Sequence, residues 1–187
     1  MGKCPIINNK PNKNVYEKGE DNKRHIKKDY KIPKYQYSIE CLKCHNEYRK
    51  KHKAKDLILD NDLAIYAQNH ADELAQKNEV FHSTCRTDKG EIIGESIYSS
   101  MKEITGKDFA DALYKDKENY NFEKPKYLSK ASRFTQLVWK GTEKVGFGFT
   151  LNKNSKQFFA VAIYYPAGNQ LGSYEENVEN DEEEKKK

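Results

Sequence analysis

Residues 144–165, KVGFGFTLNKNSKQFFAVAIYY, decide the fold class of this 187-residue chain. From Val145 to Phe149 a large apolar residue occupies every second position, as in a strand with one buried face. Residues 157–165 are a second run rich in strand-forming residues, and residues 151–155 between the two runs are typical of a turn. The stretch therefore predicts an antiparallel β-hairpin with the two runs as its strands.

Helical periodicity dominates the sequence on the N-terminal side of this hairpin. Helices are predicted at residues 38–52, 60–76, 108–119 and, as a shorter helix or turn, 129–139. Ser38 is the predicted N-cap of the first helix, and one further strand is predicted at residues 91–98. Because the helices come mainly before the strands, the order favours an α+β fold over a doubly wound α/β fold.

The charged residues are distributed unevenly along the chain. The whole sequence has 34 Lys or Arg and 29 Asp or Glu, a net charge of +5. Residues 1–37 have a net charge of +6, residues 38–178 have +1, and residues 179–187 have −2. We therefore predict a basic flexible arm, one folded domain and a charged tail over these three ranges, with both ends mostly disordered. The near-neutral domain argues against a groove for nucleic acid.

The N-terminal residues bear on the cellular compartment. They contain no apolar segment typical of a secretory signal peptide, so we expect an intracellular protein that is not secreted. The longest apolar run, residues 158–165, is too short to span a bilayer. Gly2 is a candidate myristoylation site and Cys4 a candidate for a second acyl chain, although the motif asks for Ser or Thr where this chain has Ile6. An acyl chain and the basic arm together would hold the protein on an anionic membrane; a solvated tail is the alternative.

The four cysteines are expected to be reduced thiols, since no export signal is recognised. Cys41, Cys44 and His45 match the C-x-x-C-H pattern of haem attachment, which we reject because that attachment follows export. Together with Cys85 they are also conceivable zinc ligands. Adjacent Cys44 and His45 would point about 100° apart on a helix, which favours small helix residues over a metal site.

Seven short motifs, in order along the chain, point to one family. They are CHNEYR at residues 44–49, LAIYAQ at 63–68, FHS at 81–83, GESI at 94–97, NYNF at 119–122, RFTQLVW at 133–139 and YPAGN at 165–169. Together they resemble the CAP superfamily of cysteine-rich secretory proteins, antigen-five allergens and pathogenesis-related proteins. Ala162, at the place of a disulfide cysteine of secreted members, and the start Met1-Gly2-Lys3 resemble the intracellular, Golgi-associated plant pathogenesis-related branch.

This resemblance implies an α-β-α sandwich with a central antiparallel sheet. It also implies a non-enzymatic protein that binds sterols, fatty acids or anionic phospholipids and associates with Golgi or other intracellular membranes. The loop Asn119-Tyr120-Asn121-Phe122 would then lie near the lipid-contacting region. Two alternatives are kept: a protein-interaction or scaffold module that forms a homodimer, and a metal-dependent or Ser-His hydrolase, for which no Gly-x-Ser-x-Gly elbow is found.

The resemblance further implies a central cleft with two histidines and two acids, which binds zinc or another divalent metal in many members. His82 and Glu95 match the first histidine and the first acid. Asp116 matches the second acid, with Glu118 as the nearby alternative, and Arg133 replaces the second histidine. A guanidinium has no lone pair to donate, so we expect no metal cofactor, with Arg133 paired to Glu95 and Asp116 in place of the cation. Alternatively, the four residues only tie the sheet to the helices.

The remaining histidines and the serines near the cleft residues complete the candidates. His45 and Arg49, with Asn46 between them, are interpreted as a polar helix face buried against the sheet. His70 is interpreted as a satisfied core histidine and His52 as a surface residue in a lysine-rich stretch. The serines close in sequence to the cleft residues are Ser83, Ser96, Ser99 and Ser100.

Overall fold

The computed structural model describes residues 16–18, 24–26, 32–83, 86, 90 and 92–181. Its helices are α1 (Ile32–Lys51), α2 (Asn61–Lys77), α3 (Gly106–Tyr114), α4 (Ser132–Leu137) and α5 (Tyr174–Asn177), with the 3-10 helices η1 (Lys115–Asn119) and η2 (Ser129–Ala131). Its strands are β1 (Tyr16–Lys18), β2 (Arg24–Ile26), β3 (Ile58–Leu59), β4 (Gly94–Ser100), β5 (Lys144–Leu151) and β6 (Phe158–Tyr165). The predicted helices and strands are confirmed in type and order.

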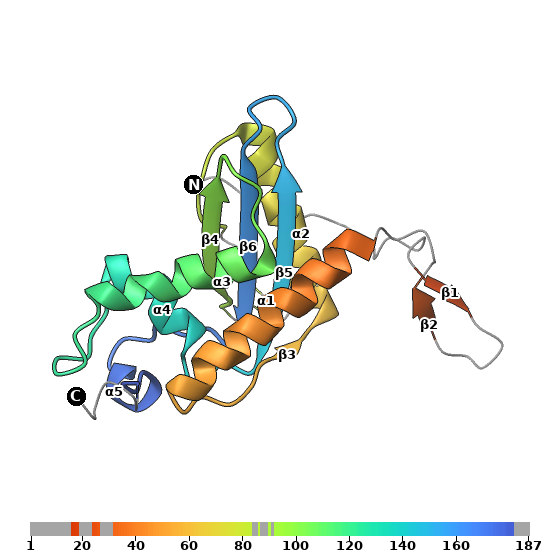
Figure 1. The fold of residues 1–187 in the computed structure, drawn as a ribbon. Coiled ribbons are helices and arrows are strands. Elements are labelled where there is room, and N and C mark those ends of the chain that lie inside the picture. Colours follow the sequence, from red (N-terminus) through yellow and green to blue (C-terminus); the bar gives the residue numbers. More distant parts are fainter. Residues whose placement is uncertain are drawn as a thin grey trace.

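A four-stranded sheet in the order β3-β5-β6-β4 forms the middle layer (Figure 1). β4 and β5 each pair antiparallel with β6, whereas the short β3 pairs parallel with β5. One face of the sheet is covered by α2 and the other by α1 and α3 (Figure 1). The chain therefore folds as the predicted α-β-α sandwich, with one parallel pair added to the predicted antiparallel sheet.

The central strand β6 serves both layers because its side chains alternate between the two faces. Its odd-numbered residues from Phe159 to Ile163 form a buried cluster with α2. Its even-numbered residues from Ala160 to Tyr164 belong to the larger cluster on the side of α1 and α3. On β5 the face toward α2 carries glycine, and at Gly146 the backbone of α2 lies directly against the strand.

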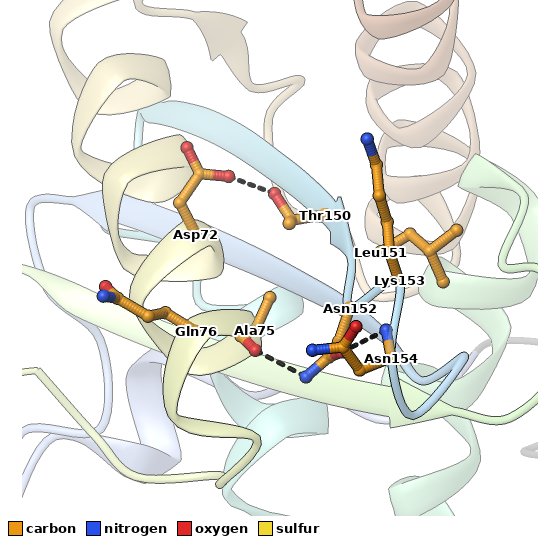
Figure 2. Close-up of a pocket in the computed structure, with 8 residues that line it drawn as sticks. All are labelled: Asp72, Ala75, Gln76, Thr150, Leu151, Asn152, Lys153 and Asn154. Carbon is orange, nitrogen blue, oxygen red and sulfur yellow. Dashed lines mark hydrogen bonds between the residues drawn. The ribbon is translucent and has the colours of Figure 1, made fainter.

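Polar side chains of α2 and of the hairpin tip bind one another (Figure 2). The Gln68 carboxamide accepts from Phe149 N–H and donates to Phe149 O, both at 3.2 Å, so it satisfies backbone groups at the edge of β5. Asp72 accepts a hydrogen bond from Thr150, and Asn152 Nδ2 donates to a carbonyl oxygen near the end of α2 at 2.8 Å. These contacts border a surface hollow of about 370 Å³ and fasten the hairpin to α2.

His45 and Arg49 on the polar face of α1 are fully buried, and His45 packs against the sheet, as predicted. His45 Nδ1 lies 2.8 Å from Cys41 O, and its Nε2 lies 3.0 Å from the Tyr164 hydroxyl. Burial lowers the pKa of His45 to about 4. The ring is therefore neutral, and because a carbonyl only accepts, Nδ1 carries the proton. Asn46 donates to Leu57 O and accepts from Leu57 N–H, which ties α1 to the residue before β3.

The C-terminal residues pack against the ends of α1 and α4. Tyr174 of α5 contacts Trp139 edge to face, with ring centroids 5.1 Å apart. His52 is fully buried, so its prediction as a surface residue is wrong. Its Nδ1 lies 2.6 Å from Glu179 O and its Nε2 lies 3.0 Å from the Tyr114 hydroxyl. His52 thus joins α1 to α3 and to the C-terminal segment.

Both ends of the domain extend beyond the predicted boundaries. α1 begins at Ile32, so Ser38 lies inside the helix and its prediction as the N-cap is wrong. Pro33 stands in the first turn, where a missing N–H costs no helical hydrogen bond. Within the predicted arm, β1 and β2 also pair antiparallel. At the other end, the Asp181 carboxylate is buried and lies 3.6 Å from Lys117 Nζ.

The candidate acylation sites Gly2 and Cys4, and Cys85 of the conceivable zinc set, lie outside the described residues. Cys41 and Cys44 are buried free thiols. Within the described ranges, no helix is both long enough and apolar enough to cross a membrane. The same ranges contain no group of three or more His, Cys, Asp or Glu side chains that could hold a metal ion.

Candidate functional site

Glu95 on β4 presents a buried carboxylate, with 7% of its side chain exposed. Its Oε1 lies 2.8 Å from His82 Nδ1 and accepts from Ser83 N–H at 2.9 Å. Its Oε2 has no hydrogen-bond partner among the described residues and lies 3.6 Å from His70 Nε2. The same nitrogen of His70 lies 3.0 Å from Phe81 O, so this buried histidine has a partner, as predicted. β4, α2 and the segment before β4 therefore meet at one carboxylate.

The hydrogen bonds at Glu95 decide the ionisation of the pair. Burial acts to raise the pKa of Glu95, but the hydrogen bonds from His82 and Ser83 outweigh it, so this pKa lies below its ordinary value. The hydrogen bond to Glu95 raises the pKa of His82 above its ordinary value, against the opposing effect of burial. Both shifts favour an ion pair between a carboxylate and an imidazolium.

The variant His82→Gln is expected to lose a pH-dependent part of the stability. Ionised Glu95 adds stability above its unfolded-state pKa of about 4.3 and loses it as the pH falls through its lower folded-state pKa. Protonated His82 adds stability below its unfolded-state pKa of about 6.5 and loses it as the pH rises through its higher folded-state pKa. The Tm difference between wild type and variant should therefore be largest between about pH 4.5 and 6.5.

Thermal unfolding followed by circular dichroism across a pH series measures this difference. The variant Glu118→Gln changes an exposed carboxylate and should give a flat difference over the same range. A Tm difference for His82→Gln that increases toward alkaline pH would contradict the ion pair.

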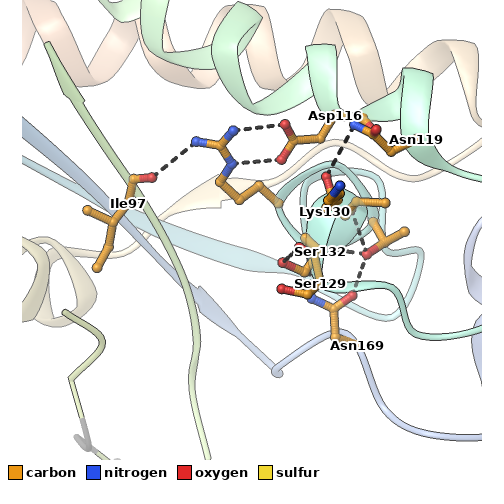
Figure 3. A network of polar contacts seen from close by, with 10 residues as sticks. Ile97, Asp116, Asn119, Ser129, Lys130, Ser132 and Asn169 are labelled. Carbon is orange, nitrogen blue, oxygen red and sulfur yellow. Dashed lines mark hydrogen bonds and ion pairs between the residues drawn. The ribbon is translucent and has the colours of Figure 1, made fainter. Parts of the chain in front are cut away.

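Arg133 on α4 holds Asp116 of η1 in a bidentate ion pair (Figure 3). Its Nε donates to Asp116 Oδ2 at 2.7 Å and its Nη2 to Asp116 Oδ1 at 2.8 Å. Its Nη1 donates to Ile97 O on β4 at 3.4 Å (Figure 3). The hydrogen bond to Asp116 raises the pKa of Arg133, although burial opposes this shift. The pair thus connects α4, η1 and β4.

The structure arranges the four predicted cleft residues as two ion pairs. Arg133 pairs with Asp116, as the sequence analysis expected. The expected contact of Arg133 with Glu95 is not among the described hydrogen bonds: Glu95 is bonded to His82 and Ser83 through Oε1, and its Oε2 lies near His70 on α2. The two pairs reach β4 two residues apart, one through the side chain at position 95 and the other through the carbonyl at position 97.

These residues do not fit a zinc site. Arg133 offers no lone pair, and it engages both carboxylate oxygens of Asp116. Of the four predicted positions, His82 and Glu95 are left as donors, fewer than the three or four protein ligands that zinc takes. The donor set therefore disagrees with the metal site that the family resemblance implies.

The variant Arg133→Ala is expected to lower the free energy of unfolding by about 1–2 kcal/mol. It leaves Asp116, whose side chain is 14% exposed, without its charged partner. Arg133→Lys keeps the charge but loses the bidentate geometry, so its loss should be intermediate. Urea denaturation measures both, with the exposed Lys130→Ala as the matched control. Wild-type stability of Arg133→Ala would show that the pair stabilises nothing.

The predicted lipid-contacting loop turns its aromatic rings inward. Tyr120 is 8% exposed, and its ring centroid lies 4.9 Å from that of Phe122 and 5.8 Å from that of Phe134. Asn119 and Asn121 are exposed. Contact of this loop with lipid stays a prediction, and its exposed members are the two asparagines.

The sequence did not predict the ion pairs that Glu179, near the C-terminal end of the domain, forms with two lysines. Glu179 Oε1 lies 2.8 Å from Lys53 Nζ, and Glu179 Oε2 lies 2.6 Å from Lys140 Nζ. No periodicity links these three segments, since each is separated from the next by a helix or a strand. The acidic residues at the start of the tail were the available signal, and they also fit a solvated tail.

The comparisons with known proteins agree with this fold and these motifs. The model of the cysteine-rich secretory protein family, CAP, matches residues 42–164. The chain is 39% identical over 145 residues to Golgi-associated plant pathogenesis-related protein 1 of Homo sapiens, covering 76% of this chain and 92% of that protein. It is 30% identical over 143 residues to secreted protein PRY1 of Candida albicans, covering 76% of this chain and 32% of that protein.

A solved structure with the same fold is venom allergen-like protein 4 of Schistosoma mansoni. The TM-score is 0.59 at 19% identity, and the match covers 81% of this chain and 99% of that chain. The fold and the motifs thus define a CAP domain. The chain belongs to the CAP, or cysteine-rich secretory protein, family, as the seven motifs indicated.

Proposed function

We propose that this chain is a non-enzymatic CAP-domain protein that binds anionic lipids or sterols and associates with intracellular membranes, including the Golgi. The observation that carries this proposal is the segregated charge, +6 in residues 1–37 ahead of a domain of +1 in residues 38–178. Each Lys or Arg near an anionic membrane contributes about 1 kcal/mol to binding. The human relative that is 39% identical bears a Golgi association in its name, which supports the choice of compartment.

The serines near the two ion pairs support a non-enzymatic function. Ser83 contacts Glu95 through its backbone N–H. Ser96 is fully buried, and the Ser99 hydroxyl accepts a hydrogen bond from a glutamine side chain at 3.2 Å. In the part of the chain that the structure describes, no serine hydroxyl is hydrogen-bonded to an imidazole, so the nucleophile and base of a Ser-His hydrolase are not assembled there.

Removal of the basic arm is expected to lower binding to vesicles that contain phosphatidylserine by at least about tenfold. The fold indicates where to shorten the chain. α1 begins at Ile32, and the buried Tyr37 ring lies 4.9 Å from that of Phe149, so a start at residue 38 would remove core contacts. A chain that begins just before Ile32 keeps all of α1. Vesicle co-sedimentation measures the change, and full-chain binding should also weaken with added salt.

A full-length variant with the lysines before Ile32 changed to glutamine separates the effect of charge from that of chain length. Unchanged vesicle binding of both variants would move the membrane contact onto the domain. Absence of binding by the full chain itself would contradict the proposal and favour the alternative, a protein-interaction module that forms a homodimer.

A further inference from the structure

Two lysines from distant segments converge on one carboxylate at the C-terminal end of the domain. Lys53 follows α1, and its Nζ lies 2.8 Å from Glu179 Oε1. Lys140 follows α4, and its Nζ lies 2.6 Å from Glu179 Oε2. Hydrogen bonds from Lys140 and Lys53 lower the pKa of Glu179 to about 2, so the carboxylate is ionised at physiological pH. The fold therefore builds a two-ammonium receptor for an oxyanion and fills it with its own side chain.

The same two lysines line a surface hollow of about 360 Å³. Lys55 also lines it and forms no ion pair with a described residue. Two acids, Asp56 and Glu143, lie in the wall as well, and Asp56 is 3.9 Å from an exposed lysine of α1. With ionised Glu179 in place, the charges of the three lysines are balanced by three carboxylates, those of the two wall acids and of Glu179. Without the charge of Glu179, the hollow is left with a cationic excess that favours an anionic ligand.

The backbone conformation at Lys53 is a second indication that the ammonium group has a role at this position. Lys53 has φ 53°, in the left-handed region that favours glycine or asparagine after a helix. At the corresponding place after α2 the chain has Asn78, also with φ 53°. A lysine at such a position is a strained choice for the backbone, and its side chain is the part that reaches Glu179.

We propose that Lys53, Lys55 and Lys140 form a binding site for a phosphate monoester, with Glu179 as a built-in competing carboxylate. Ammonium groups bind phosphate oxygens as they bind carboxylate oxygens, and a dianion is attracted more strongly than a carboxylate. The phosphate belongs either to a lipid headgroup or to a free phosphate compound. If it belongs to a lipid, this proposal rests on the membrane function proposed above; if it belongs to a free compound, it does not.

Phosphate can replace the Glu179 carboxylate by a movement of this one side chain, because other contacts hold the C-terminal segment. Lys140 N–H donates to Asn177 O at 3.1 Å, and His52 Nδ1 lies 2.6 Å from Glu179 O. These backbone contacts hold the segment in place. The Glu179 side chain is 25% exposed, so it can turn outward while the segment remains docked.

The first test uses the full chain and inorganic phosphate, without membranes. Glu179→Gln should bind phosphate about fivefold more tightly than wild type, because the competing charge is removed. Lys53→Asn in the Glu179→Gln background should abolish this gain, and asparagine suits the left-handed backbone, so the fold is preserved. The matched control is Lys156→Asn, which removes an exposed lysine at φ 62° in the hairpin turn and should change nothing. NMR titration of backbone amides measures affinity and location together.

Vesicle binding distinguishes the two sources of phosphate. Phosphatidylcholine vesicles are compared with the same vesicles containing phosphatidic acid, which has a phosphate monoester, or phosphatidylserine, which does not. A gain of Glu179→Gln on phosphatidic acid and not on phosphatidylserine indicates a lipid headgroup, whereas a gain on inorganic phosphate alone indicates a free phosphate compound. Equal phosphate affinity of wild type and Glu179→Gln, or a gain that survives Lys53→Asn, would overturn the site. These outcomes are independent of whether the basic arm binds membranes.

Discussion

Arg49→Ala is expected to lower the free energy of unfolding by about 4 kcal/mol or more. The Arg49 side chain is fully buried, and its guanidinium donates four hydrogen bonds to backbone carbonyls. The acceptors are Lys55 O at 2.7 Å, Leu137 O and Trp139 O at 2.9 Å, and Thr142 O at 2.8 Å. Alanine would leave these carbonyls without their donor and open a cavity the size of an arginine side chain.

Burial lowers the pKa of Arg49 to about 10, which still leaves it charged at neutral pH. Guanidinium donors point in several directions within one plane, so one side chain can reach four carbonyls from two segments. Lysine keeps the charge but offers a single point of donation, so Arg49→Lys should lose nearly as much stability as Arg49→Ala.

Guanidinium chloride denaturation measures these losses. The control Lys51→Ala changes an exposed residue of the same helix and should shift the free energy of unfolding by less than about 0.5 kcal/mol. If Arg49→Ala does not fold, the midpoint of Arg49→Lys still tests the prediction. A loss below about 1 kcal/mol for both variants would mean that the four hydrogen bonds contribute little net stability.

Arg49 also connects the core to the proposed phosphate site. Its hydrogen bonds to Leu137, Trp139 and Thr142 fix the segment that follows α4. This segment carries Lys140, which forms an ion pair with the side chain of Glu179. A loss of Arg49 should therefore disturb the phosphate site as well as the stability.

The regular elements could be predicted because their apolar spacing is local. The β5–β6 hairpin and α2 follow from alternation and from helical periodicity in one window of sequence each. The start of α1 could not be found that way. Ser38 is a favourable N-cap residue, but the true first turn contains Pro33, which is equally compatible with a helix start, and the tertiary contacts of Tyr37 decide between them.

The candidate site could be predicted in part, because opposite charges and family motifs identify Arg133 and Asp116 as partners. The contacts of Glu95 depend on which face of β4 its side chain occupies. The Glu95 carboxylate lies near His70 of α2, and no sequence pattern relates these two residues. His52 illustrates the same limit: it lies seven residues after the buried His45, yet the lysines around it suggested a surface.

Gly148→Ala is expected to destabilise the fold by about 3 kcal/mol or more, because it forces α2 away from β5. A Cβ at Gly148 would lie 2.3 Å from both the carbonyl carbon and the oxygen of Ala67, and 2.4 Å from Gln68 N. These are backbone atoms of α2, so no change of rotamer relieves the overlap. The helix must shift as a body, and Gln68, which caps the edge of β5, must shift with it.

The matched control is Gly141→Ala, where the nearest atom to the new Cβ is the Asn177 side-chain oxygen at 3.1 Å. That side chain can move by a few tenths of an ångström, so a loss below about 1 kcal/mol is expected. Thermal and urea unfolding compare the two variants. Because α2 also carries His70 beside Glu95, a displaced α2 should alter the pH dependence of stability that the Glu95 pair provides. A Gly148→Ala protein with wild-type Tm would show that α2 does not pack on β5 at this distance, and the glycine face of the strand would then need another explanation.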